Sequence, residues 1–109
     1  MERILRYINE HLHESLDLQS VAGYAGYSVW HLSEKFKQYT GVTFIEYVRN
    51  RRMYLAVYDL QQGASVTDIT MRYGYDSLTG FERAFHKVFG CMPSEFLKDA
   101  QRYAKRYEE

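Results

Sequence analysis

The chain of 109 residues has very little cysteine and proline, and it has no long apolar run. Its one cysteine, Cys91, cannot form a disulfide within the chain, and its one proline, Pro93, lies near the C-terminus, so glycine provides most of the breaks. No stretch has the pattern of a signal peptide or of about 18 apolar residues that could span a bilayer. These absences predict a cytoplasmic protein with no membrane partner.

The chain also lacks an excess of charge of either sign, because 14 basic residues balance 14 acidic ones. A neutral total argues against nucleic acid as a partner, since neutralisation of phosphates by Lys and Arg supplies most non-specific affinity. The distribution is uneven, however. Residues 29–56 carry a net charge of +3 and residues 77–109 carry +1, whereas residues 1–28 and 57–76 each carry −2. The positive charge is therefore concentrated in two segments.

Apolar and aromatic residues are abundant, at 46% and 17% of the chain, which predicts a folded protein and, at this length, a single domain over residues 1–109. The apolar residues recur at intervals of three and four, and no sustained alternation appears, which is typical of an all-α fold. Breaks at glycine divide the chain into seven predicted helices, near residues 2–13, 18–25, 29–40, 43–62, 66–73, 77–89 and 93–104.

Start signals support several of these helices. Asp17 is a candidate N-cap between apolar residues that could form a hydrophobic staple. Thr43 with Glu46, and Ser65 with Asp68, have the spacing of capping boxes. Pro93 suits the first turn of the last helix.

The sequence repeats itself at a period of about fifty residues. Val21, Ala25-Gly26-Tyr27, Leu32, Phe36, Gly41 and Glu46-Tyr47 answer to Ile69, Tyr73-Gly74-Tyr75, Phe81, Phe85, Gly90 and Glu95-Phe96. The offset is 48 before the second turn and 49 after it, which predicts one added residue between Asp76 and Phe81. Each copy has a short helix, a glycine turn and a longer amphipathic helix, as in a helix-turn-helix. We expect a first unit at residues 1–42, a connecting helix at 43–62 and a second unit at 63–109.

A helix pair with a glycine turn also occurs in bundles and solenoids that bind no DNA, so one copy does not decide between these classes. Two copies favour DNA. A connecting helix of about 20 residues spans about 30 Å, close to the roughly 34 Å between successive major grooves on one face of B-DNA. A single chain could then insert two recognition helices into adjacent grooves.

These residues also resemble a known family. The segments that carry the resemblance are residues 21–28 (VAGYAGYS), residues 31–41 (HLSEKFKQYTG), residues 73–77 (YGYDS), residues 81–85 (FERAF) and Phe89-Gly90. They are similar, in order and spacing, to the AraC/XylS family of bacterial transcription regulators. The resemblance implies a seven-helix domain that binds double-stranded DNA through its third and sixth helices, with a separate effector domain outside this chain. The sequence departs from the family pattern at Thr70, usually Ala, and at Met92, where a capping Thr is usual.

The candidate base contacts of the first unit lie near the start of its longer helix. Leu32 and Phe36 define the buried face, which leaves Trp30, Ser33 and Glu34 on other faces, at positions that match the family's base-contact positions. The alternative for Trp30 is packing in the core. Glu34 departs from the basic or amide side chain usual there; a carboxylate can accept from cytosine N4 but repels phosphate. We expect Glu34 to contribute to specificity at a cost in affinity.

The second unit has the same arrangement, with Phe81 and Phe85 as buried anchors. Arg83 is the best candidate for a bidentate contact to guanine, and the alternative is an ion pair with Asp76 or near Glu82. The candidate base contacts of this helix are Leu78, Thr79, Glu82 and Arg83.

Phosphate contacts are expected from basic residues on or near the two recognition helices. The candidates are Lys35, Lys37, Arg49, Arg52, His86 and Lys87. The alternative for Arg49 and Arg52, together with Arg51, is a role in packing between the two units.

Other function classes find no support in the sequence. His11 and His13 lie two apart on a helix with no cysteine near them, so no metal site and no cofactor are predicted. Cys91 has no evident base, and no phosphate loop, carboxylate pair or Ser-His arrangement appears, so the chain is not expected to be an enzyme. A protein-interaction module that docks RNA polymerase or an effector domain remains the alternative. We expect this domain to form the N-terminal part of a longer regulator.

Overall fold

The computed structural model describes residues 1–98, and the all-α prediction is confirmed. The helices with both ends in this range are α1 (Glu2–Glu10), α2 (Leu18–Ala25), α3 (Val29–Thr40), α4 (Phe44–Gln61), α5 (Val66–Arg72) and α6 (Leu78–Phe89). Residues 93–98 are the described part of a seventh helix, whose predicted continuation to residue 104 lies outside the described residues. Residues 1–98 contain no strand.

The chain divides into two compact units within α4. The first unit comprises Met1–Arg52 and the second begins at Met53, so each unit includes one half of α4. The sequence predicted a connecting helix at residues 43–62 that belonged to neither unit. In the structure, each unit includes part of α4 in its core.

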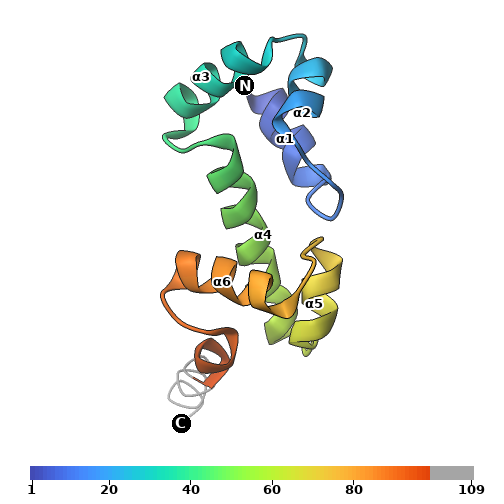
Figure 1. Cartoon of the computed structure of the whole chain (residues 1–109), viewed down its shortest axis with the longest axis vertical. Helices are drawn as coiled ribbons and strands as arrows, with labels where there is room; N and C mark the ends of the chain where they lie inside the picture. The colour runs from blue at the N-terminus through green and yellow to red at the C-terminus, as the bar shows by residue number, and fades with distance from the viewer. Residues whose placement is uncertain (99–109) are drawn as a thin grey trace. The chain divides into compact units, whose positions relative to one another are not determined.

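The core of the first unit lies between α1, α2, α3 and the first half of α4. α2 contacts both α1 and α3 (Figure 1). Ile8, Leu32 and Phe36 are completely buried, and the Phe36 ring meets the rings of Phe44 and Tyr47 edge-on at centroid distances of 5.7 and 5.3 Å. The recognition helix α3 is thus anchored by the residues that its periodicity predicted.

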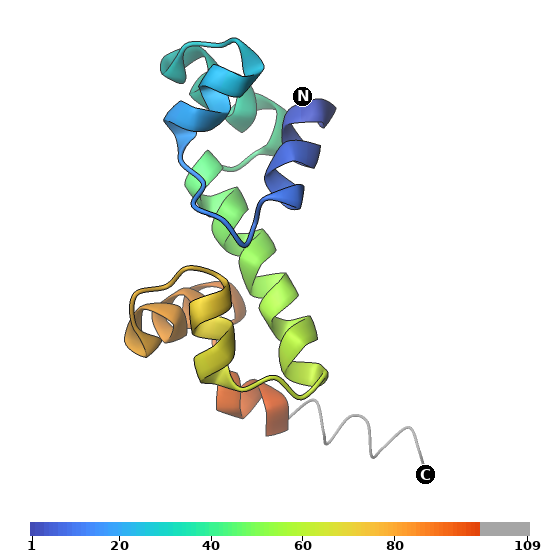
Figure 2. The same cartoon turned by 90° about the vertical axis from the view of Figure 1, so that its right-hand side faces the viewer.

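The core of the second unit repeats this arrangement with α5, α6 and the second half of α4. α5 packs against α6 (Figure 2), and Met53, Phe81 and Phe85 are completely buried. Tyr73 is also buried, and its hydroxyl donates to the Asp59 carboxylate at 2.6 Å. Burial and this hydrogen bond raise the pKa of Tyr73 above its ordinary value, so the hydroxyl keeps the proton that it donates.

The unusual residue Thr70 fits this core without a polar penalty. It is buried in α5, where its Oγ1 donates to the carbonyl oxygen of Val66 at 2.8 Å. Its counterpart in the first unit, Ala22, is buried as well. A satisfied hydroxyl therefore takes the position of a methyl group.

The N-cap bonds of the predicted start signals are confirmed. Asp17 accepts from the backbone N–H of Ser20 at 2.7 Å, and Ser65 Oγ accepts from that of Asp68 at 3.1 Å. Thr43 Oγ1 accepts from Glu46 N–H at 3.2 Å, which is one half of the predicted capping box.

The predicted end of the first helix at residue 13 was wrong, because α1 stops at Glu10. Arg52 of α4 donates from Nε to the carbonyl oxygen of Leu12 at 2.9 Å and from Nη2 to that of Glu14 at 2.7 Å. These carbonyls follow the helix end, and a guanidinium some 40 residues further along the chain satisfies them. Local sequence did not contain this signal.

The added residue of the second repeat also lies elsewhere than predicted. Tyr27 N–H donates to the carbonyl of Ala22, and Tyr75 N–H donates to that of Thr70, so the two turns still match at an offset of 48. The N-caps that follow, Ser28 and Ser77, already match at 49. The insertion is therefore Asp76, before the sixth helix, and does not shift the register of residues within that helix.

Candidate nucleic-acid interface

The start of α3 is fixed by two residues with distinct tasks. Gly26 ends α2 in the left-handed conformation, with φ 77°, which glycine adopts without the steric cost of a side chain. Ser28 is the N-cap of α3, and its Oγ accepts from the His31 backbone N–H at 3.1 Å. The turn therefore sets the direction and rotation with which α3 leaves α2.

One face of α3 carries the predicted base contacts. Trp30, Ser33, Glu34 and Lys37 are exposed. Ser33 and Glu34 each lie three or four residues from both Trp30 and Lys37, so the four side chains lie on one stripe of the helix. The Trp30 side chain is 72% exposed, which makes the alternative of core packing wrong. An exposed indole of this size on a recognition helix leaves a large apolar surface open to a partner.

The same face is hollowed next to this stripe. A shallow hollow of about 440 Å³ is lined by Ser33, Glu34, Lys37, Gln38 and Thr43. Gln38 was not among the sequence candidates, although its counterpart at an offset of 49, Lys87, was. The internal repeat could therefore have identified it.

The second unit presents α6 in the same way. Ser77 is the N-cap, its Oγ accepts from the Gly80 N–H at 3.1 Å, and Phe81 and Phe85 face the core. Leu78, Thr79 and Arg83 are exposed, while Glu82 is half-buried. Glu82 is thus the least accessible of the four predicted base contacts in this helix.

Arg83 lies with two further basic residues around a second hollow. Arg83, His86, Lys87 and Met92 line a space of about 340 Å³, which brings together one predicted base contact and two predicted phosphate contacts. Within residues 1–98, no ion pair joins Arg83 to Asp76 or Glu82. The intrahelical pairing offered as the alternative for Arg83 is therefore absent from this part of the chain.

The N-caps of α3 and α6 show which residues of the two exposed stripes correspond in sequence. With Ser28 on Ser77, the residues of α3 and α6 correspond as Trp30 to Thr79, Ser33 to Glu82, Glu34 to Arg83, and Lys37 to His86. The chemistry therefore differs at every position: a large ring against a small hydroxyl, and an acid against a base. Two units of one fold present different recognition surfaces.

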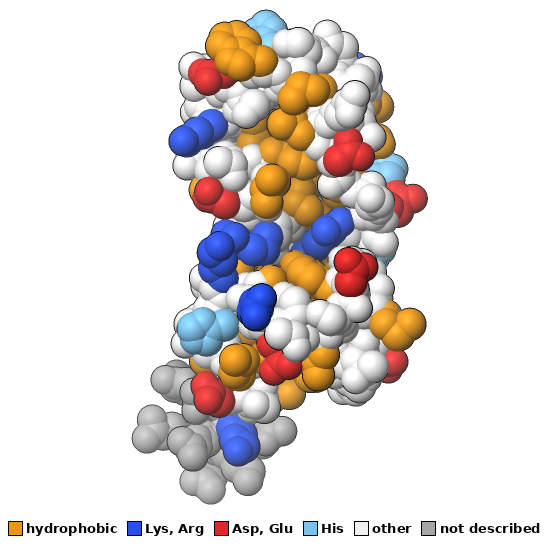
Figure 3. Space-filling view, in the orientation of Figure 1, with side chains coloured by type: hydrophobic (Ala, Val, Ile, Leu, Met, Phe, Trp, Pro, Cys, Tyr) orange, Lys and Arg blue, Asp and Glu red, His pale blue; other side chains and the backbone are white. Residues whose placement is uncertain are grey.

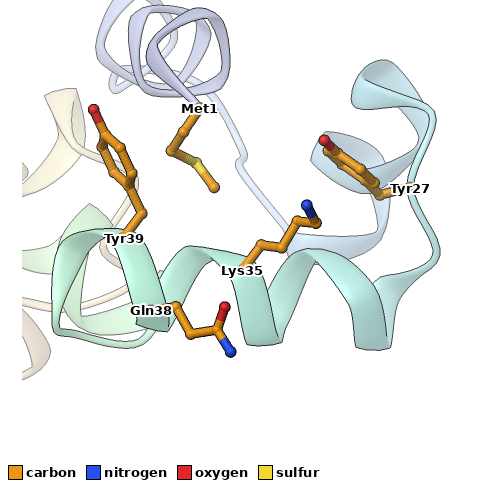
Figure 4. A pocket seen from close by; sticks show the side chains of 5 residues that line it. All are labelled: Met1, Tyr27, Lys35, Gln38 and Tyr39. Carbon is orange, nitrogen blue, oxygen red and sulfur yellow. The ribbon is translucent and has the colours of Figure 1, made fainter.

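The predicted phosphate contacts of the first unit do not all lie on one side of α3. Lys35 lies on a different side of α3 from the base-contact stripe. Its Nζ is 5.7 Å from the centre of the Tyr27 ring, and Figure 4 shows it beside a hollow of about 320 Å³ that Met1, Tyr39 and Gln38 also line. A cation over an aromatic face gains a modest attraction, and Lys35 remains exposed.

Two of the three arginines of α4 donate hydrogen bonds within the first unit. Arg52 holds the carbonyls of Leu12 and Glu14, as described above, and Arg51 Nε donates to Asn9 Oδ1 at 2.9 Å. Arg49 is half-buried, and its Nε has no hydrogen-bond partner among the described residues. Any phosphate contact by Arg52 must use a guanidinium that already donates to the segment after α1.

The surface charge of each unit is mixed. Both basic and acidic side chains lie on the visible face of each unit (Figure 3). Within residues 1–98, no helix has both the length and the apolar character needed to cross a bilayer, and no group of three potential ligands among His, Cys, Asp and Glu could hold a metal ion.

The sequence of this chain is similar to a helix-turn-helix family and to bacterial regulatory proteins. Residues 21–99 match the family described as "Helix-turn-helix domain". The chain is 38% identical over 99 residues to the "Probable transcription factor PqrA" of Proteus vulgaris, which covers 88% of this chain and 81% of that protein. It is 35% identical over 97 residues to the "Regulatory protein SoxS" of Salmonella typhimurium, at 88% and 91% coverage.

Solved structures of transcription regulators have the same fold. The C-terminal domain of AraT, a response regulator from Geobacillus stearothermophilus, superimposes with a TM-score of 0.84 at 32% identity, covering 90% of this chain and 83% of that one. A transcriptional regulator from Chromobacterium violaceum, described as containing an AraC-type DNA-binding domain, gives 0.80 at 27% identity, with 86% and 85% coverage. The fold and the family match over residues 21–99 define a protein with two helix-turn-helix units in tandem. The chain belongs to the AraC/XylS family of transcription regulators, as its sequence predicted.

Proposed function

We propose that this chain binds double-stranded DNA sequence-specifically and regulates transcription, inserting α3 and α6 into adjacent major grooves. The observation that carries the proposal is the pair of exposed stripes. Each starts two residues after a serine N-cap, lies opposite two fully buried anchors, and presents side chains that can pair with base edges. Family membership and the AraC-type DNA-binding neighbour support it.

The roles within the stripes follow from their chemistry. Trp30 packs its indole against a thymine methyl or a sugar, Glu34 accepts from cytosine N4, and Arg83 donates to guanine O6 and N7. Ser33, Thr79, Leu78 and Glu82 complete the base-facing set, with Glu82 limited by its partial burial. We expect phosphate contacts from Lys37, His86 and Lys87, because Lys37 and His86 are exposed at the C-terminal ends of the two stripes and Lys87 is exposed next to His86.

A salt titration on a random-sequence duplex tests the proposal. Neutralisation of about six phosphates gives a steep linear fall of log affinity with log salt, with a slope near −5. A protein-interaction module without a DNA site would give no such slope. Selection of bound sequences from a random duplex pool then supplies the specific site.

Contact with RNA polymerase is a second candidate, favoured by exposed aromatic surface outside the stripes. Tyr39 and Tyr54 are each 59% exposed, and tyrosine is typical of protein interfaces. The test is retention of the chain by immobilised polymerase in high salt, without DNA, and its loss on substitution of these tyrosines by serine.

A separate effector domain outside this chain also stays a prediction. SoxS, of which this chain covers 91%, leaves little room for such a domain in that relative.

A further inference from the structure

A polar contact links α1 to the core behind the first recognition helix. Asn9 of α1 donates from Nδ2 to the Tyr47 hydroxyl at 3.1 Å, and Asn9 Oδ1 accepts from Arg51 at 2.9 Å. A second Asn9 bond, from Nδ2 to the Leu5 carbonyl at 2.8 Å, holds the amide on its own helix. Asn9 therefore fixes where the Tyr47 hydroxyl lies.

The Tyr47 ring in turn contacts the anchor of α3. Its centroid is 5.3 Å from that of Phe36 at an interplanar angle of 82°, and Phe36 is completely buried on the face opposite the base-contact stripe. Phe36 lies between Glu34 and Lys37 in the sequence. A shift or tilt of the Tyr47 ring would therefore change how α3 is rotated and which way that stripe points.

The second unit shows that the polar pair is not needed to fill the core. At an offset of 49, Tyr47 corresponds to Phe96 and Phe36 to Phe85; these rings meet at 5.8 Å, also at 82°. At an offset of 48, Asn9 corresponds to Val57, which packs against the same core cluster. The ring contact is thus common to both units, whereas the amide and the hydroxyl occur only in the first.

We propose that Asn9 and Tyr47 are positioning residues that set the orientation of α3, and so determine sequence specificity in the first unit without touching DNA. A hydrogen bond is directional, whereas packed apolar rings keep stability while losing uniqueness of orientation. The inference rests on the proposed function, because it assumes that α3 reads bases.

The decisive variant is Tyr47→Phe, which gives the first unit the ring that the second unit has. Asn9 keeps its bonds to Leu5 and Arg51, so the fold should persist with little change in denaturation midpoint. We expect the ratio of specific to random-duplex affinity to fall about threefold to tenfold, the equivalent of one side-chain hydrogen bond, with an unchanged salt slope. Tyr58→Phe is the matched control, because it removes an exposed hydroxyl from the same helix.

Trp30 provides a second readout, since it is the only tryptophan and lies on α3. Its fluorescence change on binding the specific duplex should be smaller in Tyr47→Phe than in the wild type or in Tyr58→Phe. A merely structural role for the hydroxyl would lower stability but leave the specificity ratio and the Trp30 signal of the folded protein alone.

Adding Asn9→Val to Tyr47→Phe tests whether the two residues act as one unit. The double variant should lose no more specificity than Tyr47→Phe, because the bond is already broken. An additive loss, or a Tyr47→Phe variant with wild-type specificity and Trp30 response, would overturn the inference alone. A wild-type chain that binds no duplex would overturn it together with the proposed function.

Discussion

Glu34 is the residue whose chemistry departs furthest from that expected of a DNA-binding surface. It is exposed on the base-contact stripe, and no ion pair within residues 1–98 neutralises it. A bare carboxylate near phosphates lowers affinity for every sequence, so its presence on this face requires a compensating gain. We propose that acceptance of a hydrogen bond from cytosine N4 supplies that gain at one base pair.

Glu34→Ala should therefore change two quantities in opposite directions. Affinity for random duplex should rise because a repulsive charge is gone, while the preference for cytosine at one position should disappear. Competition binding against duplexes that differ at each position of the selected site measures both. If neither quantity changes, Glu34 is a solvated residue, and the base-contact stripe of α3 is rotated from its proposed position.

Arg83 occupies the corresponding position in the second unit with the opposite charge. Arg83→Ala should relax the preference for guanine at one position by about 1 to 3 kcal/mol, since a bidentate pair to O6 and N7 is lost. Arg6→Ala removes an exposed positive charge from α1 and is the control. Equal losses in the two variants, spread over all sequences, would reduce Arg83 to a general electrostatic contribution.

Features of the helices that depend on nearby residues could be predicted from the sequence, whereas features that depend on distant residues could not. The starts of α2, α3, α5 and α6 could be predicted because each depends on a side chain that bonds a backbone N–H three residues away. The rotation of α3 and α6 could be predicted from the spacing of their aromatic and aliphatic anchors. Both are properties of short segments.

The end of α1 and the roles of Arg51 and Arg52 could not be predicted, because their partners lie far away in the sequence. Arg52 bonds to Leu12 and Glu14, and Arg51 bonds to Asn9, across separations of 38 to 42 residues. The sequence around an arginine near a recognition helix does not show whether its guanidinium binds a DNA phosphate or a backbone carbonyl of the protein. Only the fold distinguishes these two uses.

A variant of Arg52 tests whether this side chain stabilises the fold by joining α4 to the segment after α1. Arg52→Ala leaves two carbonyl acceptors without their guanidinium donor, which should lower the free energy of unfolding by about 1 to 3 kcal/mol. Chemical denaturation measures this loss, and Arg6→Ala again serves as an exposed control. A variant with wild-type stability but a salt slope reduced by about one would instead assign Arg52 to phosphate.

The whole molecule carries two different recognition units in one chain. Other helix-turn-helix proteins obtain a second unit by dimerising and bind two-fold symmetric sites with half-sites about one helical turn apart. Here the repeat within the chain supplies the second unit, and the two stripes share no residue type at corresponding positions. One chain should therefore suffice for one site, and the site should be asymmetric.

The most direct test is to select bound duplexes from a random pool and then measure the mass of the complex by sedimentation. We expect one chain per duplex, on a site with two unlike blocks whose centres lie about 10 base pairs apart. Arg83→Ala should relax one block and Glu34→Ala the other. Two chains on a short palindromic site, or a single block that both variants affect equally, would show that the two units do not read one asymmetric site.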